Sequence, residues 1–69
     1  MNDVQLPGPK VVIWPAEDGW RWRLTARNGE LVAESGEAYD TKWNARRAVV
    51  RLLDLADNVR RREAIEVRG

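Results

Sequence analysis

Acidic side chains and a single serine are the groups in this sequence that could take part in catalysis. Glu17 and Asp18 are adjacent, and paired carboxylates can serve general acid–base chemistry or metal binding. They precede Gly19 in a pattern typical of a hairpin turn, which supplies no desolvated pocket. Ser35 is the only serine, and the sequence has no histidine to activate it and no cysteine. The sequence therefore predicts a protein that is not an enzyme and needs no cofactor or metal.

A second candidate for chemistry is the stretch Trp20-Arg21-Trp22-Arg23-Leu24, in which aromatic and basic residues alternate. Such a surface could bind nucleic acid, because aromatic rings stack on bases and guanidinium groups bind phosphates. A strand, however, places alternate side chains on opposite faces, so the tryptophans face the core and the arginines face solvent. The net charge of +1 is also too balanced for a protein that coats nucleic acid. Nucleic-acid binding through an Arg-rich surface is therefore the alternative function.

The favoured candidate is an interaction surface for another protein. Pairing of the first two predicted strands places Trp14 opposite Arg21, and a cation–π contact there would contribute about 0.5–1 kcal/mol. Exposed Trp and Arg side chains are typical of binding hot spots. Lys42, at the predicted start of a helix, either binds an anion or is a solvated side chain. The candidate interaction surface consists of Trp14, Arg21, Arg23, Trp43 and Arg47.

Three predicted strands position these residues. Runs of β-branched and aromatic residues between turn residues predict strands over about residues 10–15, 20–27 and 30–35. Pro15 ends the first strand because proline has no N–H to donate. The four-residue loop Ala16–Gly19 then sets the register of the first hairpin. The predicted pairs are Pro15 with Trp20, Trp14 with Arg21, Ile13 with Trp22, and Val11 with Leu24.

The pair Asn28-Gly29 is typical of a two-residue hairpin turn and sets the register of the second hairpin. The expected pairs are Arg27 with Glu30, Ala26 with Leu31, Thr25 with Val32, Leu24 with Ala33, and Arg23 with Glu34. The two turns agree on one inner face, which favours an antiparallel meander. That face is formed by Val11, Ile13, Trp20, Trp22, Leu24, Ala26, Leu31 and Ala33.

A helix is predicted over about residues 41–60, with Asp40 or Thr41 as its N-cap. Its apolar residues follow the spacing of a one-sided amphipathic helix: Ala45, Ala48, Val49, Leu52, Leu53, Ala56 and Val59. The period-two alternation at residues 64–68 predicts a fourth strand, and residues 1–9 are expected to form a flexible arm. Residues 10–69 then form a single α+β domain with the order β-β-β-α-β.

Several of these motifs together resemble the YegP-like family of small bacterial and archaeal domains of unknown function. The resemblance covers about residues 10–52, and its motifs are Gly19-Trp20-Arg21-Trp22-Arg23-Leu24, Ala26-Arg27-Asn28-Gly29-Glu30, Ala33-Glu34-Ser35 and Gly36-Glu37-Ala38-Tyr39-Asp40-Thr41-Lys42. The chain departs from the family pattern at Trp43 and at Arg47-Ala48-Val49. The resemblance implies that two units form one sheet and exchange their C-terminal strands. It therefore implies a homodimer in which the exchanged strand carries Ala64, Ile65 and Val67.

The length of 69 residues also favours self-association, because a chain this short without disulfides buries only a small core. No signal peptide or apolar run long enough to span a membrane is visible, so a cytoplasmic protein without membrane contact is expected. The sequence thus predicts a small homodimeric binding module of unknown process, which contacts a protein partner through the sheet face or the helix surface.

Overall fold

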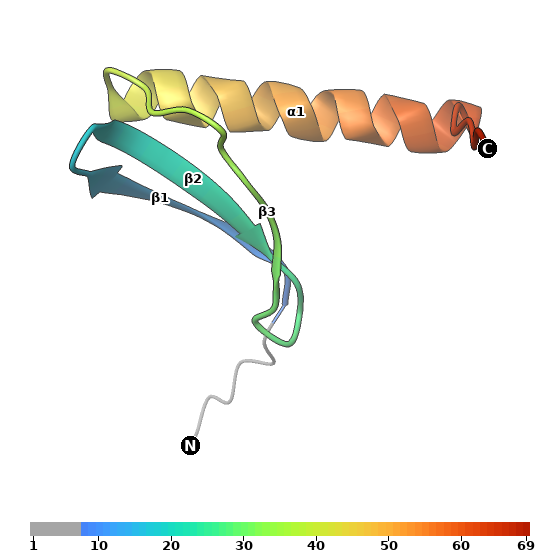
Figure 1. Ribbon diagram of the computed structural model, residues 1–69, viewed down its shortest axis with the longest axis horizontal. Helices are drawn as coiled ribbons and strands as arrows, with labels where there is room; N and C mark the ends of the chain where they lie inside the picture. Colours follow the sequence, from blue (N-terminus) through green and yellow to red (C-terminus); the bar gives the residue numbers. More distant parts are fainter. Residues whose placement is uncertain (1–7) are drawn as a thin grey trace.

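Three antiparallel strands and one helix form two layers in the computed structural model, which describes residues 8–69 (Figure 1). The elements are β1 (Lys10–Ala16), β2 (Gly19–Thr25), β3 (Leu31–Glu34) and α1 (Lys42–Arg62). The sheet order is β1-β2-β3. This confirms the predicted meander followed by a helix; most of the predicted arm over residues 1–9 lies outside the described residues.

The first hairpin has the register that the sequence predicts. Val11 pairs with Leu24, Ile13 with Trp22, Trp14 with Arg21, and Pro15 with Trp20. The pairing extends one step further, to Ala16 and Gly19, so the turn contains only two residues instead of the predicted four. Gly19 has a φ of 135°, and a Cβ there would lie 2.7 Å from the carbonyl oxygen of Tyr39. Only glycine fits at position 19, because this φ is unfavourable for residues with a Cβ and because the carbonyl of Tyr39 leaves no room for one.

The second hairpin differs from the prediction at its tip. The amide of Gly29 donates to the carbonyl oxygen of Ala26 (2.9 Å), and the amide of Ala26 donates to that of Glu30 (2.8 Å). With Gly29 at a φ of 88°, this is a three-residue loop and not the predicted two-residue turn. Thr25 consequently pairs with Leu31 and not with Val32, and a bulge restores the predicted pairs Leu24–Ala33 and Arg23–Glu34. Leu31, predicted to face the core, is 55% exposed.

The chain after β3 continues alongside β2. The amide of Ser35 donates to the carbonyl oxygen of Trp22 (2.9 Å), and the hydroxyl of Ser35 accepts from the amide of Trp22 (3.2 Å). Further on, Trp20 and Tyr39 exchange two backbone hydrogen bonds of 2.8 Å. Ser35 is buried, so its role is to complete the backbone pairing of the central strand.

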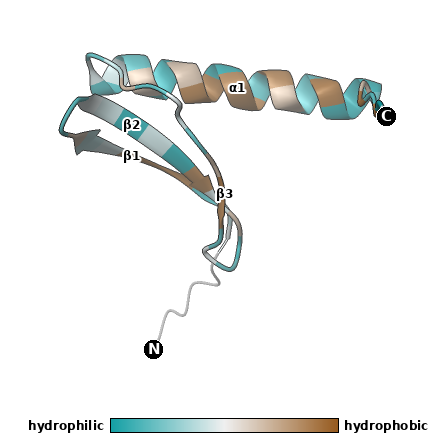
Figure 2. Cartoon of the chain, in the orientation of Figure 1, coloured by the Kyte–Doolittle hydropathy of each residue, from teal (hydrophilic) through white to brown (hydrophobic). Residues whose placement is uncertain are grey.

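Helix α1 begins at the predicted cap and packs on the sheet through its first half. The hydroxyl of Thr41 accepts a hydrogen bond from the amide of Asn44 (3.0 Å), which identifies Thr41 as the N-cap. Ala45 and Val49 are buried, as is Trp22 on the central strand. The core is therefore small, and Figure 2 shows apolar residues continuing along α1 beyond the sheet.

The predicted fourth strand over residues 64–68 is not formed in the single chain. Helix α1 continues to Arg62, and Glu63 adopts the left-handed conformation with a φ of 52°. The amides of Glu63 and Ala64 donate to the carbonyl oxygens of Arg60 and Val59, which is the Schellman arrangement that stops a helix. A strand needs a neighbouring edge, and α1 carries the tail beyond the sheet that its first half covers (Figure 1).

Candidate interaction surface

The outer face of the sheet contains a cation–π contact, but with a different arginine from the one predicted. The guanidinium carbon of Arg23 lies 5.2 Å from the ring centroid of Trp14. Arg23 is the diagonal neighbour of Trp14 across the strand pair, a position that a long side chain can reach. The directly opposite residue, Arg21, turns instead toward the hairpin turn. Trp14 is only half-buried, so one face of this cluster remains open to solvent.

Arg21 is held by an acidic partner in the hairpin turn. Its Nη2 and Nε atoms lie 2.6 and 3.2 Å from the two carboxylate oxygens of Asp18, and its Nη1 lies 3.4 Å from the carbonyl oxygen of Ser35. The hydrogen bond from Arg21 lowers the pKa of Asp18, and the same bond raises the pKa of Arg21. Asp18 is thus a structural anion of the turn, and Arg21 is less available to a ligand than the sequence suggests.

Trp43 lies beside a small cavity where the start of α1 meets β1 and β2. The cavity has a volume of about 120 Å³ and is lined by Ile13, Trp20, Lys42, Trp43 and Arg46. Trp43 is 63% exposed, and the Nζ atom of Lys42 lies 5.2 Å from its ring centroid. An apolar floor with two cationic residues in the lining can hold one aliphatic side chain; a cavity of about 150 Å³ accommodates benzene.

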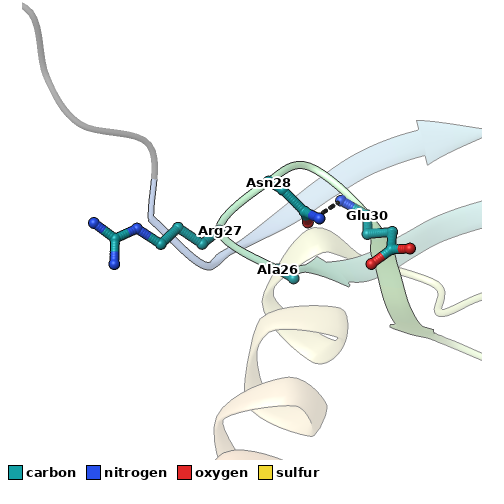
Figure 3. Close-up of a pocket in the computed structure, with 4 residues that line it drawn as sticks. All are labelled: Ala26, Arg27, Asn28 and Glu30. Carbon is teal, nitrogen blue, oxygen red and sulfur yellow. Dashed lines mark hydrogen bonds between the residues drawn. The ribbon is translucent and has the colours of Figure 1, made fainter.

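A wider depression lies at the tip of the second hairpin, lined by Ala26, Arg27, Asn28 and Glu30 (Figure 3). The side chain of Asn28 accepts a hydrogen bond from the amide of Glu30 (3.1 Å), which stabilises the loop. Figure 3 shows Arg27 extending away from Glu30, so the predicted pairing of these two charges is not seen. The three-residue loop explains this, because it places the two side chains out of register.

Large apolar side chains are exposed on the second half of α1 and on the tail. We define the apolar surface as the residues there that are large, apolar and at least 40% exposed: Leu52, Leu53, Leu55, Val59, Ile65 and Val67. Of these, Ile65 and Val67 are 74% and 91% exposed. Several large apolar side chains exposed in one part of a small protein are typical of an interaction site.

Basic residues near the end of α1 are partly neutralised. Asp57 lies 2.9 Å from the Nε atom of Arg61 and 3.4 Å from an Nη atom of Arg60. Asp57 and Arg61 thus form an ion pair one helical turn apart, and this pair interrupts the positive charge along the helix. A continuous track for phosphates is therefore not formed by these residues.

The predicted interaction surface is divided by the fold into separate parts. Trp14 and Arg23 are in contact on the sheet, whereas Trp43 lies by the cavity at the start of α1. Arg47 is exposed on α1 and does not line that cavity. Sequence reasoning missed Arg46 as a neighbour of Trp43. Arg46 follows Lys42 by four residues and Trp43 by three, and these spacings place all three side chains on the same helix face.

Two general features of the described residues bear on function. No helix in residues 8–69 is long and apolar enough to cross a membrane. In the same residues no three acidic side chains cluster closely enough to hold a metal ion.

Comparison with known proteins identifies a domain family. The profile of the domain of unknown function DUF1508 matches residues 16–63, which include β2, β3 and all of α1. The searches of curated proteins and of solved structures each found no match. The matched region contains the Trp-Arg alternation, the Asn-Gly loop and the start of α1, which are the motifs of the YegP-like resemblance. The chain therefore belongs to the DUF1508, or YegP-like, family.

Proposed function

We propose that this protein is a homodimeric protein-binding module, in which the apolar surface of α1 and the tail forms the dimer interface. The observation that carries the proposal is the exposure of the apolar surface, while the buried apolar residues of the core among residues 8–69 are only Trp22, Ala45 and Val49. Burying a large aliphatic side chain contributes about 1.5–3 kcal/mol. A second copy would bury several such side chains from each chain at once.

The tail supports the same proposal. The Schellman motif at Glu63 separates residues 64–69 from the helix, and no other strand of residues 8–69 pairs with them. Ile65 and Val67 then share one side of an extended segment, because alternate residues of a strand face the same way. In the single chain both are exposed, so a second copy is the simplest source of burial for them.

The test of the dimer is its mass in solution. Size-exclusion chromatography with light scattering should give twice the chain mass for residues 1–69, and a truncated chain ending at Glu63 should be a monomer or partly unfolded. A monomer of the full chain at high micromolar concentration would contradict the proposal. A truncated chain that remains an intact dimer would exclude the tail from the interface.

We further propose that the dimer binds a protein partner through two pairs of residues: the exposed Trp43 and Arg47 on α1, and the half-buried Trp14 with Arg23 on the sheet. A pull-down from host lysate with the intact protein should capture a partner that Trp43→Ala and Arg47→Ala variants lose, while Gly36→Ala should not affect capture. Salt-sensitive binding to nucleic acid in gel shifts would instead support the alternative function. The pairing of Arg21 and Arg61 with aspartates argues against that alternative.

A further inference from the structure

We propose that the cavity beside Trp43 binds an acidic peptide segment of a partner protein. One aliphatic side chain of the segment enters the cavity, and carboxylates on either side of it face Lys42 and Arg46. This site is one part of the proposed protein-binding surface, so the inference rests on that proposal and adds the chemistry of the partner. The proposed dimer interface is not involved, because no residue that lines the cavity belongs to the apolar surface of α1 and the tail.

The floor of the cavity is apolar and is held in place by the sheet. Ile13 and Trp20 are diagonal neighbours on the inner face of β1 and β2. Trp20 is paired with Pro15 on β1, and on its other side it exchanges two backbone hydrogen bonds of 2.8 Å with Tyr39. Trp20 is therefore fixed from both sides, and a floor that is already ordered lowers the entropic cost of binding.

The volume of the cavity selects a single small apolar group. It is about 120 Å³, whereas a cavity that holds benzene has about 150 Å³. A leucine or valine side chain is smaller than benzene, and a nucleobase is larger. Pockets for drug-sized small molecules and cofactors have volumes of about 300–1,000 Å³. The dimensions therefore favour one aliphatic side chain of a protein over a nucleotide or a free small molecule.

The rim of the cavity carries positive charge that the chain itself does not neutralise. Lys42 and Arg46 both line the cavity, and no acidic residue among 8–69 does. Neither cation takes part in an ion pair within these residues, and the first turn of α1 contains no acidic residue. By contrast, Arg21, Arg60 and Arg61 are each paired with an aspartate. A partner with carboxylates supplies the charge that complements the two cations of the rim.

Trp43 joins the apolar and the charged parts of the site. Its side chain is 63% exposed, and the Nζ atom of Lys42 lies 5.2 Å from its ring centroid. An exposed Trp beside basic residues is typical of a binding hot spot. Neighbouring residues of an extended peptide are about 3.3 Å apart, so carboxylates directly before and after the inserted residue stay close to the rim.

Titration of the full chain with short peptides, followed by NMR of the tryptophan indole N–H signals, tests the site. The acetylated and amidated peptide Gly-Asp-Leu-Glu-Gly should shift the signals of Trp20 and Trp43 but not that of Trp14, which lies on the opposite face of the sheet. The uncharged peptide Gly-Asn-Leu-Gln-Gly should bind at least about threefold more weakly. The peptide Gly-Asp-Ser-Glu-Gly, which lacks the aliphatic side chain, should bind at least about tenfold more weakly. Equal binding of all three peptides, or unchanged signals of Trp20 and Trp43, overturns the inference.

Two charge variants form a matched pair. Arg46→Gln removes a cation of the rim and should weaken binding of Gly-Asp-Leu-Glu-Gly at least about threefold. Arg51→Gln removes an exposed cation of the same helix that does not line the cavity, and it should change the affinity less than about twofold, because salt screens distant charges. Trp43→Ala should weaken binding at least about tenfold, and the amide signals far from the cavity check that this variant still folds. Equal weakening by both arginine variants would reveal non-specific attraction and refute the site.

Failure of this site and failure of the proposed function give different results. If the peptide did not bind but capture of a lysate partner still depended on Trp43, the acidic and aliphatic chemistry would be wrong and protein binding would stand. Peptide binding by a chain that is monomeric in solution would support the site and contradict only the dimer. A single-stranded oligothymidine that shifted the same indole signals at a lower concentration than the peptide would replace the peptide assignment with nucleic-acid binding.

Discussion

Replacing Ile65 with alanine tests the dimer at the side chain for which the structure gives a clear magnitude. The change removes three carbon groups, at about 0.8 kcal/mol each, and so about 2.4 kcal/mol for complete burial. Ile65 is 74% exposed in the single chain, so about 1.8 kcal/mol per chain depends on the partner. In the proposed dimer two tails take part, which gives about 3.6 kcal/mol, or a several-hundredfold increase in the dissociation constant.

The assay is sedimentation equilibrium or light scattering over a concentration series, with Glu66→Ala as the matched control. Glu66 lies in the same segment but on the opposite face, and its carboxylate pairs with Arg68 at 3.0 Å. Its replacement should change the dissociation constant by less than about fivefold. If Ile65→Ala and Glu66→Ala weakened the dimer equally, the reasoning from alternate faces would be refuted.

Three further predictions concern the fold. Gly19→Ala should destabilise the protein by about 1–3 kcal/mol in thermal melts, because Gly19 has a φ of 135° and a Cβ there would lie 2.7 Å from the carbonyl oxygen of Tyr39. The control Gly36→Ala should be nearly neutral, because no atom lies within 4 Å of the position where its Cβ would be. Glu63→Gly should raise stability by about 0.5–1 kcal/mol at a fixed protein concentration, since Glu63 has a left-handed φ of 52°. Arg21→Gln should raise the pKa of Asp18 in an NMR titration, because the hydrogen bond that lowers this pKa is lost. The lowered pKa stabilises the folded state at pH values above the unfolded-state pKa of about 3.9. This stabilisation is lost as the pH falls through the lower pKa of the folded state.

Local signals predicted the elements well where one residue type determines the backbone. The turn before Gly19 and the apolar alternation of β2 were sufficient to give the register of the first hairpin pair by pair. Thr41 was one of two caps that the sequence allowed, and its hydroxyl hydrogen bond decides between them. The length of α1 was predicted to within two residues at its C-terminal end.

The errors occurred where two local solutions are close in energy. Asn28-Gly29 fits a two-residue turn, but a three-residue loop with Gly29 in the left-handed region also satisfies it, and this choice moved Leu31 out of the core. Arg21 had both Trp14 and Asp18 within reach, and it adopts the charge-assisted hydrogen bond. Neither competition can be resolved from residue types alone.

The sequence by itself determined the meander, the helix and the family, because alternation, turn glycines and helical spacing act over a few neighbouring residues. Only the tertiary structure decided which apolar residues lack cover: α1 extends beyond the sheet, so Leu52 through Val59 and the tail remain exposed although their spacing is that of a buried face. It likewise decided that Ile13, Trp20 and Trp43 surround one cavity. Burial depends on the length of one element relative to another, and that relation exists only once the layers are packed.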